Sequence, residues 1–357
     1  MAVQTPIVDH DKLMAFLGQV IGELGATVNA GLIVVGDRLG LYRAMAGAGP
    51  ISSSELAEKT GTAERYIREW LNAQAAGGYV KYDAATQTYE LPPEQAMALA
   101  DEDSPAFVGG AFELATATLK SIPHIEDVFR SGAGFGWHEH DLGVSTGCER
   151  FFRPGYNANL VSTWIPALTG VEEKLRVGAR IADVGCGLGA SSRLMAGAYP
   201  RSRVTGFDYH RESIELARQK ARAAGLSDRL SFEVAPAASF PGTGYDLVTV
   251  FDSLHDMGDP VGAAKHVKQA LAEDGTWLII EPIAGDKVEQ NLNPVGRAYY
   301  AFSNFLCVPS SLSQEVGLAL GAQAGEKRIR DVVTAAGFAR FRRIGETPFN
   351  LAYEVRP

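Results

Sequence analysis

From about residue 165 onward, short apolar runs alternate with longer stretches in which apolar residues recur every three or four positions. Short runs bounded by turn residues are typical of buried strands, and the longer periodic stretches are typical of helices. Strands are expected at residues 181–184, 203–207, 230–234, 245–251, 276–281, 340–344 and 351–355. Helices are expected at 190–199, at 260–271, which begins with Pro260, and at 326–336, which Gly337 closes.

This alternation decides the fold class. Strands that alternate with helices favour an α/β fold with a mainly parallel, doubly wound sheet and right-handed crossovers. The last two strands are joined by a short turn that contains glycine and proline. We therefore expect them to add an antiparallel edge to the sheet.

The N-terminal part has a different pattern, typical of a winged helix, between Leu39 and Met97. Ser52 is placed to cap a helix, with Glu55 completing a capping box. A second helix is expected at 63–74, and two short strands at 79–82 and 88–91 would form the wing. Such a fold can bind DNA through its second helix.

Charge argues against DNA binding. The chain of 357 residues has a formal net charge of −9. Residues 1–120 hold 8 Lys and Arg against 15 Asp and Glu, and Glu64 and Glu69 flank Arg65 and Arg68 on the expected recognition helix. A nucleic-acid reader would concentrate positive charge there, and an anionic membrane surface would be repelled as well. We therefore expect neither nucleic acid nor membrane as a partner.

Two further features concern the location of the protein. Its cysteines, Cys148, Cys186 and Cys307, are sparse and lack metal-binding spacing, and no secretory signal is visible, so we expect a cytoplasmic protein. The segment Val20–Leu41 is apolar but contains charged residues. We interpret it as buried or dimer-forming helices rather than a membrane span.

A glycine loop follows the expected strand 181–184. It contains Gly185, Gly187 and Gly189, and Asp183 precedes it. The spacing differs from the dinucleotide fingerprint, and no Lys-Ser or Lys-Thr follows, which excludes the NTPase loop. Asp208 ends the next strand, where an acid binds ribose hydroxyls. The two acids and the loop favour S-adenosylmethionine, and an irregular NAD site is the alternative.

With these motifs, residues 165–357 resemble a class I S-adenosylmethionine-dependent methyltransferase. The whole chain resembles two-domain small-molecule O-methyltransferases, and in particular the bacterial winged-helix methyltransferases with Leu-His-Asp-Met-Gly-Asp, here Leu254–Asp259. The resemblance implies a Rossmann-like seven-stranded sheet, a winged-helix dimerisation domain at 1–105, a helical linker over the active site at 106–164, and a homodimer. It also implies S-adenosylmethionine as cofactor, S-adenosylhomocysteine as product, and no metal.

The resemblance assigns catalytic roles at the ends of two strands. His255 matches the general base of plant-type O-methyltransferases, Glu281 matches the acid that orients it, and Asp256 would fix the turn or contact substrate. Histidine suits proton abstraction near neutral pH. The alternatives are that His255 only caps or packs the strand end, and that the enzyme works by proximity alone.

The expected donor-binding residues lie in the glycine loop and at the following strand ends. They are Asp183, Gly185, Cys186, Gly187, Gly189, Asp208, Tyr209, Ala237, Phe251 and Asp252. This chain departs from the plant-type pattern in three places. Ala235-Pro236-Ala237 replaces the acid that meets adenine, which leaves Ala237 and Phe240 as candidates; Phe251 replaces a donor-binding lysine; and Glu326 matches a second orienting acid only with an offset of one position.

The acceptor should be bound by aromatic residues from two segments. The candidates are Phe152 and Tyr156 in the linker, and Tyr299, Phe302, Asn304 and Phe305 in the insert before the last helix. Inserts at the carboxyl face of a sheet commonly build sites, and an apolar pocket would suit a flat, hydrophobic acceptor. Simple packing of these aromatic residues is the alternative. Trp137, His138 and His140 form a cluster that is weak evidence for a metal.

Three hypotheses follow. The first is a homodimeric methyltransferase that acts on a small hydroxylated molecule. The second is a regulator that senses S-adenosylmethionine and binds DNA through the winged helix. The third is a family member that binds the donor but performs other chemistry, such as decarboxylation or hydroxylation.

Overall fold

The computed structural model describes residues 8–357, and the chain divides into two compact units, of which the first ends at Thr116 and the second begins at Ala117. The division lies within one helix, α6 (Gly109–Thr118). The predicted domain boundaries at residues 105 and 164 stay predictions.

The first unit is a small winged helix. Its elements are α1 (His10–Arg38), α2 (Leu41–Met45), α3 (Ser53–Thr60), α4 (Glu64–Ala76), β1 (Lys81–Asp83), β2 (Thr88–Glu90) and α5 (Pro93–Leu99). Ser52 and Glu55 form the predicted capping box at the start of α3, and β1 pairs with β2 in an antiparallel hairpin. The core gathers around Tyr42 and Trp70, whose rings meet edge to face at 5.1 Å.

Helix α1 corrects one expectation. It is a single helix of 29 residues, and the segment from Val20 onward is mostly not buried within the chain. Its exposed apolar side chains include Leu13, Met14, Phe16, Leu17, Val20, Ile21, Leu24 and Val28. Among the described helices, α1 alone is long and apolar enough to cross a membrane by length and composition. Length and composition alone therefore allow a span, and the interpretation of this segment as a dimer-forming helix stays a prediction.

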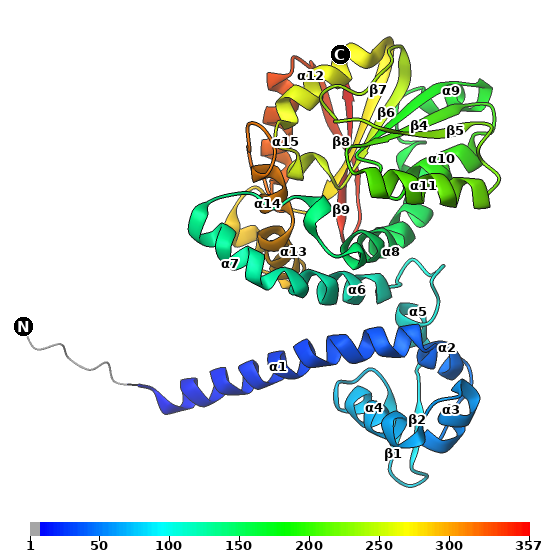
Figure 1. Cartoon of the computed structure of the whole chain (residues 1–357), viewed down its shortest axis with the longest axis vertical. Helices are drawn as coiled ribbons and strands as arrows, with labels where there is room; N and C mark the ends of the chain where they lie inside the picture. Colours follow the sequence, from blue (N-terminus) through cyan, green and yellow to red (C-terminus); the bar gives the residue numbers. More distant parts are fainter. Residues whose placement is uncertain (1–7) are drawn as a thin grey trace, which may run out of the picture. The chain divides into compact units, whose positions relative to one another are not determined.

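The second unit is built on a seven-stranded sheet with the order β5-β4-β3-β6-β7-β9-β8 (Figure 1). The strands are β3 (Arg180–Val184), β4 (Arg203–Asp208), β5 (Leu230–Val234), β6 (Tyr245–Phe251), β7 (Leu271–Pro282), β8 (Arg340–Glu346) and β9 (Asn350–Arg356). The first five pair in parallel, and β9 lies antiparallel between β7 and β8. The α/β class, the seven strands and the antiparallel edge are therefore confirmed.

Helices cover both faces of this sheet (Figure 1). The helices of this unit are α7 (Ile122–Ser131), α8 (Leu142–Asn159), α9 (Val171–Val177), α10 (Ala190–Ala198), α11 (Arg211–Ala223), α12 (Pro260–Ala270), α13 (Pro294–Phe305), α14 (Cys307–Leu312) and α15 (Gly325–Ala335), of which α7, α13 and α14 lie beyond one end of the strands (Figure 1). Short 3₁₀ turns lie at Leu119–Ser121, Trp137–Glu139, Leu254–Asp256 and Val288–Asn291, and a π-helical turn at Leu160–Trp164 follows α8.

The central strands are buried on both faces, as expected for a parallel sheet between helices. Successive residues of β6 point to opposite sides, so Leu247 packs in the core with α9 and α10, whereas Val248 packs in the core with α12 and α15. Doubly wound sheets bind ligands at the carboxyl ends of their strands, and Asp208 is the last residue of β4.

Candidate active site

A cavity of about 580 Å³ opens at the carboxyl ends of β3, β4 and β6. Gly185 and Gly187 line it and have positive φ angles of 69° and 51°, a conformation that favours glycine. A Cβ on Gly185 would also lie 2.4 Å from the hydroxyl of Ser253. Gly189, with φ of 72°, precedes α10, and a Cβ there would lie 2.5 Å from the Phe232 ring. The loop therefore brings the backbone of two glycines to the cavity, whereas Gly189 serves packing.

Asp183 does not line this cavity, contrary to the expectation that it meets the ligand. Its carboxylate is fully buried and accepts hydrogen bonds from the hydroxyls of Ser191, Ser192 and Thr249. Burial raises the pKa of the Asp183 carboxyl, and the hydroxyl hydrogen bonds oppose that shift. The contacts tie the end of β3 to α10 and β6, so Asp183 shapes the loop from behind.

Asp208 lies in the cavity wall, as the sequence predicts. Its carboxylate accepts hydrogen bonds from the backbone N–H of Gly187 at 2.9 Å and of His210 at 2.8 Å. Burial raises the pKa of this carboxyl. Both bonds fix the carboxylate toward the glycine loop, the position from which an acid can bind a ribose.

Other predicted donor residues also lie in the wall, but one does not. Cys186, Tyr209, Ala237, Phe251 and Asp252 line the cavity. Phe240 is instead buried in the core, with its ring 5.1 Å from that of Phe207 and 4.5 Å from that of His266. The wall beyond β5 is formed by Ala235, Pro236, Ala237 and Ala238.

The charge of the cavity is one-sided. Its acidic lining residues are Glu149, Asp208, Asp252, Asp256, Asp259 and Glu315, of which Glu149 is paired with Arg193 and Lys220 outside the lining. Among the described residues that line it, none is a lysine or an arginine. A pyrophosphate would be repelled by this wall, whereas a ligand that carries positive charge would be favoured. The irregular NAD site is therefore disfavoured.

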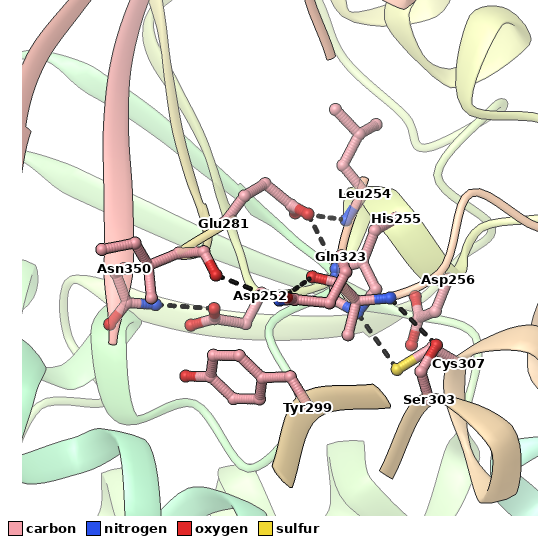
Figure 2. A network of polar contacts seen from close by, with 12 residues as sticks. Asp252, Leu254, His255, Asp256, Glu281, Tyr299, Ser303, Cys307, Gln323 and Asn350 are labelled. Atoms are coloured by element: carbon pink, nitrogen blue, oxygen red, sulfur yellow. Dashed lines mark hydrogen bonds and ion pairs between the residues drawn. The ribbon is translucent and has the colours of Figure 1, made fainter. Parts of the chain in front are cut away.

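His255 and Glu281 meet as predicted (Figure 2), with 2.7 Å between the histidine Nδ1 and a carboxylate oxygen of Glu281. The other oxygen of Glu281 accepts the backbone N–H of Leu254 at 2.9 Å. Burial opposes a charge on the His255 ring, but the Glu281 carboxylate prevails and raises the pKa of His255 well above its ordinary value. Glu281 thereby fixes the orientation of the ring.

The remaining nitrogen of that ring is blocked. Nε2 of His255 lies 3.2 Å from the Sγ of Cys307, at the start of α14 (Figure 2). His255 is only 3% exposed and is not among the residues that line the cavity. The predicted base is therefore closed off by a thiol. Glu326 does not reach it, because it pairs with Arg330 and Arg343 on the outside of the unit.

Asp256, next to the histidine, does line the cavity. One of its carboxylate oxygens accepts a hydrogen bond of 2.6 Å from the indole N–H of Trp137, which also lines the cavity. Burial raises the pKa of Asp256 to about 7, and the charge of His255 works against this shift. Trp137 thus links the segment before α8 to the turn that carries the His-Asp pair.

The predicted acceptor residues separate into two groups. Phe152 and Tyr156 of α8 line the cavity. The others, Tyr299, Phe302, Asn304 and Phe305 of α13, do not. Tyr299 is buried and donates to the carbonyl of Phe349 at 2.9 Å, and Asn304 is exposed and donates to the carbonyl of Tyr300. Helix α13 therefore supports the site from outside the cavity.

Several lining residues were missed by the sequence reasoning. Ser145, Cys148 and Glu149 lie one and two turns before Phe152 on the same face of α8. The helical spacing from Ser145 to Tyr156 could have revealed them. Gln314, Glu315 and Val316, after α14, carried no local signal.

The expectation that the protein needs no metal stays a prediction. Within residues 8–357, no group of three or more His, Cys, Asp and Glu side chains is arranged to hold a metal ion. His140 contacts the hydroxyl of Ser121 at 2.9 Å and the ring of Phe135. Burial lowers the pKa of His140 to about 4, so this ring is neutral near neutral pH.

Comparison with known proteins agrees with this architecture. Residues 27–101 match the family described as "Rv2258c-like winged HTH domain", and residues 175–317 match the family described as "Methyltransferase domain". The chain thus carries a segment similar to a methyltransferase domain and, before it, a segment similar to a winged-helix domain, which agrees with the class inferred from the sequence.

Individual relatives are more distant. Over 160 residues, the chain is 32% identical to 27-O-demethylrifamycin SV methyltransferase of Amycolatopsis mediterranei, and the match covers 44% of this chain and 47% of that protein. The chain thus spans about half the length of this relative. Mitomycin 7-O-methyltransferase has a TM-score of 0.69 at 19% identity, covering 98% of this chain and 100% of the other. Human N-acetylserotonin methyltransferase, solved in complex with SAM, has a TM-score of 0.71 at 16% identity, and the match covers 100% of this chain and 99% of the other. These two similarities establish the fold.

Proposed function

We propose that this protein transfers a methyl group from S-adenosylmethionine to a small, hydroxylated, largely apolar acceptor. The observation that carries the proposal is the cavity at the glycine loop, which has Asp208 in its wall. Among the described residues that line this cavity, several are acidic and none is a lysine or an arginine. S-adenosylmethionine fits this chemistry because it combines a ribose with an ammonium group and a sulfonium group. When bound, it supplies an electrophilic methyl group.

The residues around the loop would hold the nucleoside end. Gly185 and Gly187 allow close approach to the backbone because they have no Cβ. Asp208, fixed by two backbone N–H groups, has lone pairs left for ribose hydroxyls. The apolar wall at Ala235–Ala238 suits adenine. This assignment needs no acid beyond β5, which is the position where the chain departs from the plant-type pattern.

His255 is the general base in this proposal, with Glu281 as its orienting partner. A base must come within hydrogen-bonding distance of the hydroxyl that it deprotonates, and Cys307 stands at that position now. The acceptor hydroxyl would therefore have to displace the thiol. The competing mechanism uses Asp256, already in the cavity wall, to hold the acceptor while proximity alone drives transfer.

Calorimetry with S-adenosylhomocysteine tests the donor assignment, and folded protein that fails to bind it would contradict the proposal. Acceptors are then screened with isotope-labelled S-adenosylmethionine, and products are scored by mass. The apolar walls at Trp137, Phe152, Met257 and Val316 favour aromatic and polyketide-like compounds with a free hydroxyl as the first set. Labelled product that lacks an intact methyl group would favour the non-methylating alternative.

A homodimer formed through α1 belongs to the same proposal. The exposed apolar side chains of α1 would be covered by the α1 helix of a second copy of the chain. The DNA-binding alternative is weakened by α4, where Arg65 pairs with Glu69 and Arg68 with Glu64, each at 2.6 Å. These pairs neutralise the charge that would meet phosphates. The free cysteines fit the cytoplasm, which we propose as the location.

A further inference from the structure

Asp252 stands out within the cavity because its backbone is strained. Its φ angle is +48°, in the left-handed region that side chains other than glycine rarely adopt. Its backbone N–H still bonds to the carbonyl of Ile280 at 2.8 Å, at the end of the β6–β7 pairing. Such strain persists only where the surroundings hold it, and it gathers at ligand sites. The strained backbone places this carboxylate in the cavity wall.

Neutral groups alone hold the carboxylate. The hydroxyl of Tyr156 donates to one oxygen at 2.6 Å, and the side-chain amide of Asn350 donates to the other at 2.7 Å (Figure 2 shows the Asn350 bond). Asn350 is 3% exposed and Tyr156 is 7% exposed. Hydrogen bonds from neutral groups orient a carboxylate but do not neutralise it, so a buried acid of this kind calls for a cation or a proton.

The other charged groups nearby do not supply that cation. The titratable groups that face Asp252 come from α8, from the turn after β6, from β7 and from α13, and they are Cys148, Tyr156, His255, Glu281 and Tyr299. The only base among them, His255, is already paired with Glu281. Burial raises the pKa of Asp252 to about 8, against the opposing hydrogen bond from Tyr156. The acid therefore holds a proton at neutral pH when the cavity contains no cation.

We infer that Asp252, oriented by Tyr156 and Asn350, is the subsite for a positive charge of the methyl donor, and that donor binding expels a proton from it. This inference rests on the proposed function. S-adenosylmethionine carries two positive groups, the ammonium and the sulfonium, and both share the chemistry that Asp252 would bind. The proton leaves the carboxyl for solvent as the cation enters, so the charge of the buried site is balanced before and after binding.

Proton release is measured directly by titrating wild-type protein with S-adenosylmethionine, which carries both cations, at pH 7 in buffers of different ionisation enthalpy. We expect about one proton to be released at pH 7 and a release that declines toward zero above the pKa of about 8. Below that pKa, the affinity for S-adenosylmethionine should fall by up to about tenfold for each unit by which the pH is lowered. Binding without proton release would overturn the inference alone, whereas absence of binding would overturn the proposed function and the inference with it.

The variant Asp252→Asn assigns the proton to its residue. It should abolish the release at pH 7 and weaken the binding of S-adenosylmethionine by about tenfold or more, because an amide cannot balance a cation. The matched control is Asp256→Asn, which removes the neighbouring acid of the same wall and should leave most of the release intact. Release that survives in Asp252→Asn and disappears in Asp256→Asn would overturn the assignment.

Two further ligands separate binding of charge from a structural role. 5′-Methylthioadenosine lacks the amino-acid part and is neutral, so Asp252→Asn should bind it as wild type does, which also shows that the variant is folded. If Asp252→Asn lost as much affinity for 5′-methylthioadenosine as for S-adenosylmethionine, Asp252 would not be a subsite for a positive charge. If Asp252→Asn loses affinity for both S-adenosylmethionine and S-adenosylhomocysteine, the bound cation is the ammonium. If it loses affinity for S-adenosylmethionine alone, the bound cation is the sulfonium.

Discussion

The two halves of the candidate site, the glycine-loop half and the half around His255, differ in whether a ligand can enter without a rearrangement. On the donor side, Gly185, Gly187 and Asp208 already face an open cavity. On the chemical side, His255 is buried, and both of its ring nitrogens are occupied, by Glu281 and by Cys307. The difference teaches that a site can be preorganised for its first ligand and still closed to its second. Under the proposed function, this difference predicts an ordered reaction in which acceptor entry must open the contact at Cys307.

The largest expected effect is at the closed half. His255→Ala should lower turnover by about 10² to 10⁴, the range typical of general acid–base catalysis. Affinity for S-adenosylhomocysteine should change little, because the ring does not line the cavity. In wild type, turnover should rise with pH through a pKa above the ordinary value of 6.5, since the base works deprotonated and Glu281 raises its pKa. Turnover that is unchanged in His255→Ala would favour the proximity mechanism.

The open half should show the opposite pattern. Asp208→Ala removes the acceptor of two backbone N–H bonds and the expected ribose partner. A hydrogen bond from a ribose hydroxyl to this carboxylate is worth about 1.5–3 kcal/mol. The affinity for S-adenosylhomocysteine should therefore fall by about 100-fold in calorimetry. The control is Asp228→Ala, which removes an exposed acid that pairs with Arg229. Equal losses in the two variants would mean that Asp208 has no specific role.

Cys307 tests the boundary between the halves. Cys307→Ala removes the thiol from Nε2 of His255, so the acceptor no longer has to displace it. We expect acceptor KM to fall by about three- to tenfold while donor affinity stays constant, a modest effect because only one weak hydrogen bond is replaced. Cys148→Ala, which removes a thiol from the cavity wall at α8, is the matched control. A loss of turnover as large as in His255→Ala would instead make the thiol a support for the ring.

The same contrast explains what the sequence could predict. The sheet and the glycine loop depend on local signals, namely apolar runs, periodic stretches and glycines at strand ends. Asp208 is the last residue of its strand and carries a signal of the same local kind. The blocking of His255 depends on a residue 52 positions later, and the withdrawal of Asp183 depends on hydroxyls from α10 and β6. Whether an acid faces a ligand or a hydroxyl is decided by packing between elements. Residue type and spacing do not contain that information, and they also placed Phe302, Asn304 and Phe305 in a cavity that α13 only supports.

The last expected effect is on stability, and it reports the charge of the open half without any acceptor. The pKa values of Asp252 and Asp256 are raised to about 8 and about 7 by burial. Because both acids bind protons more tightly in the folded than in the unfolded state, their contribution to the free energy of unfolding falls as pH rises from about 4 to about 8. The slope is at most about 1.4 kcal/mol per pH unit for each acid. Denaturant unfolding of ligand-free protein from pH 5 to pH 8 measures it, and Asp252→Asn should flatten the slope between pH 7 and 8. Saturating S-adenosylmethionine should flatten it too, because a bound cation replaces the proton. A ligand-free slope in this interval that is the same in wild type and Asp252→Asn would mean that Asp252 is already ionised, and that the open half is held ready by charge from elsewhere.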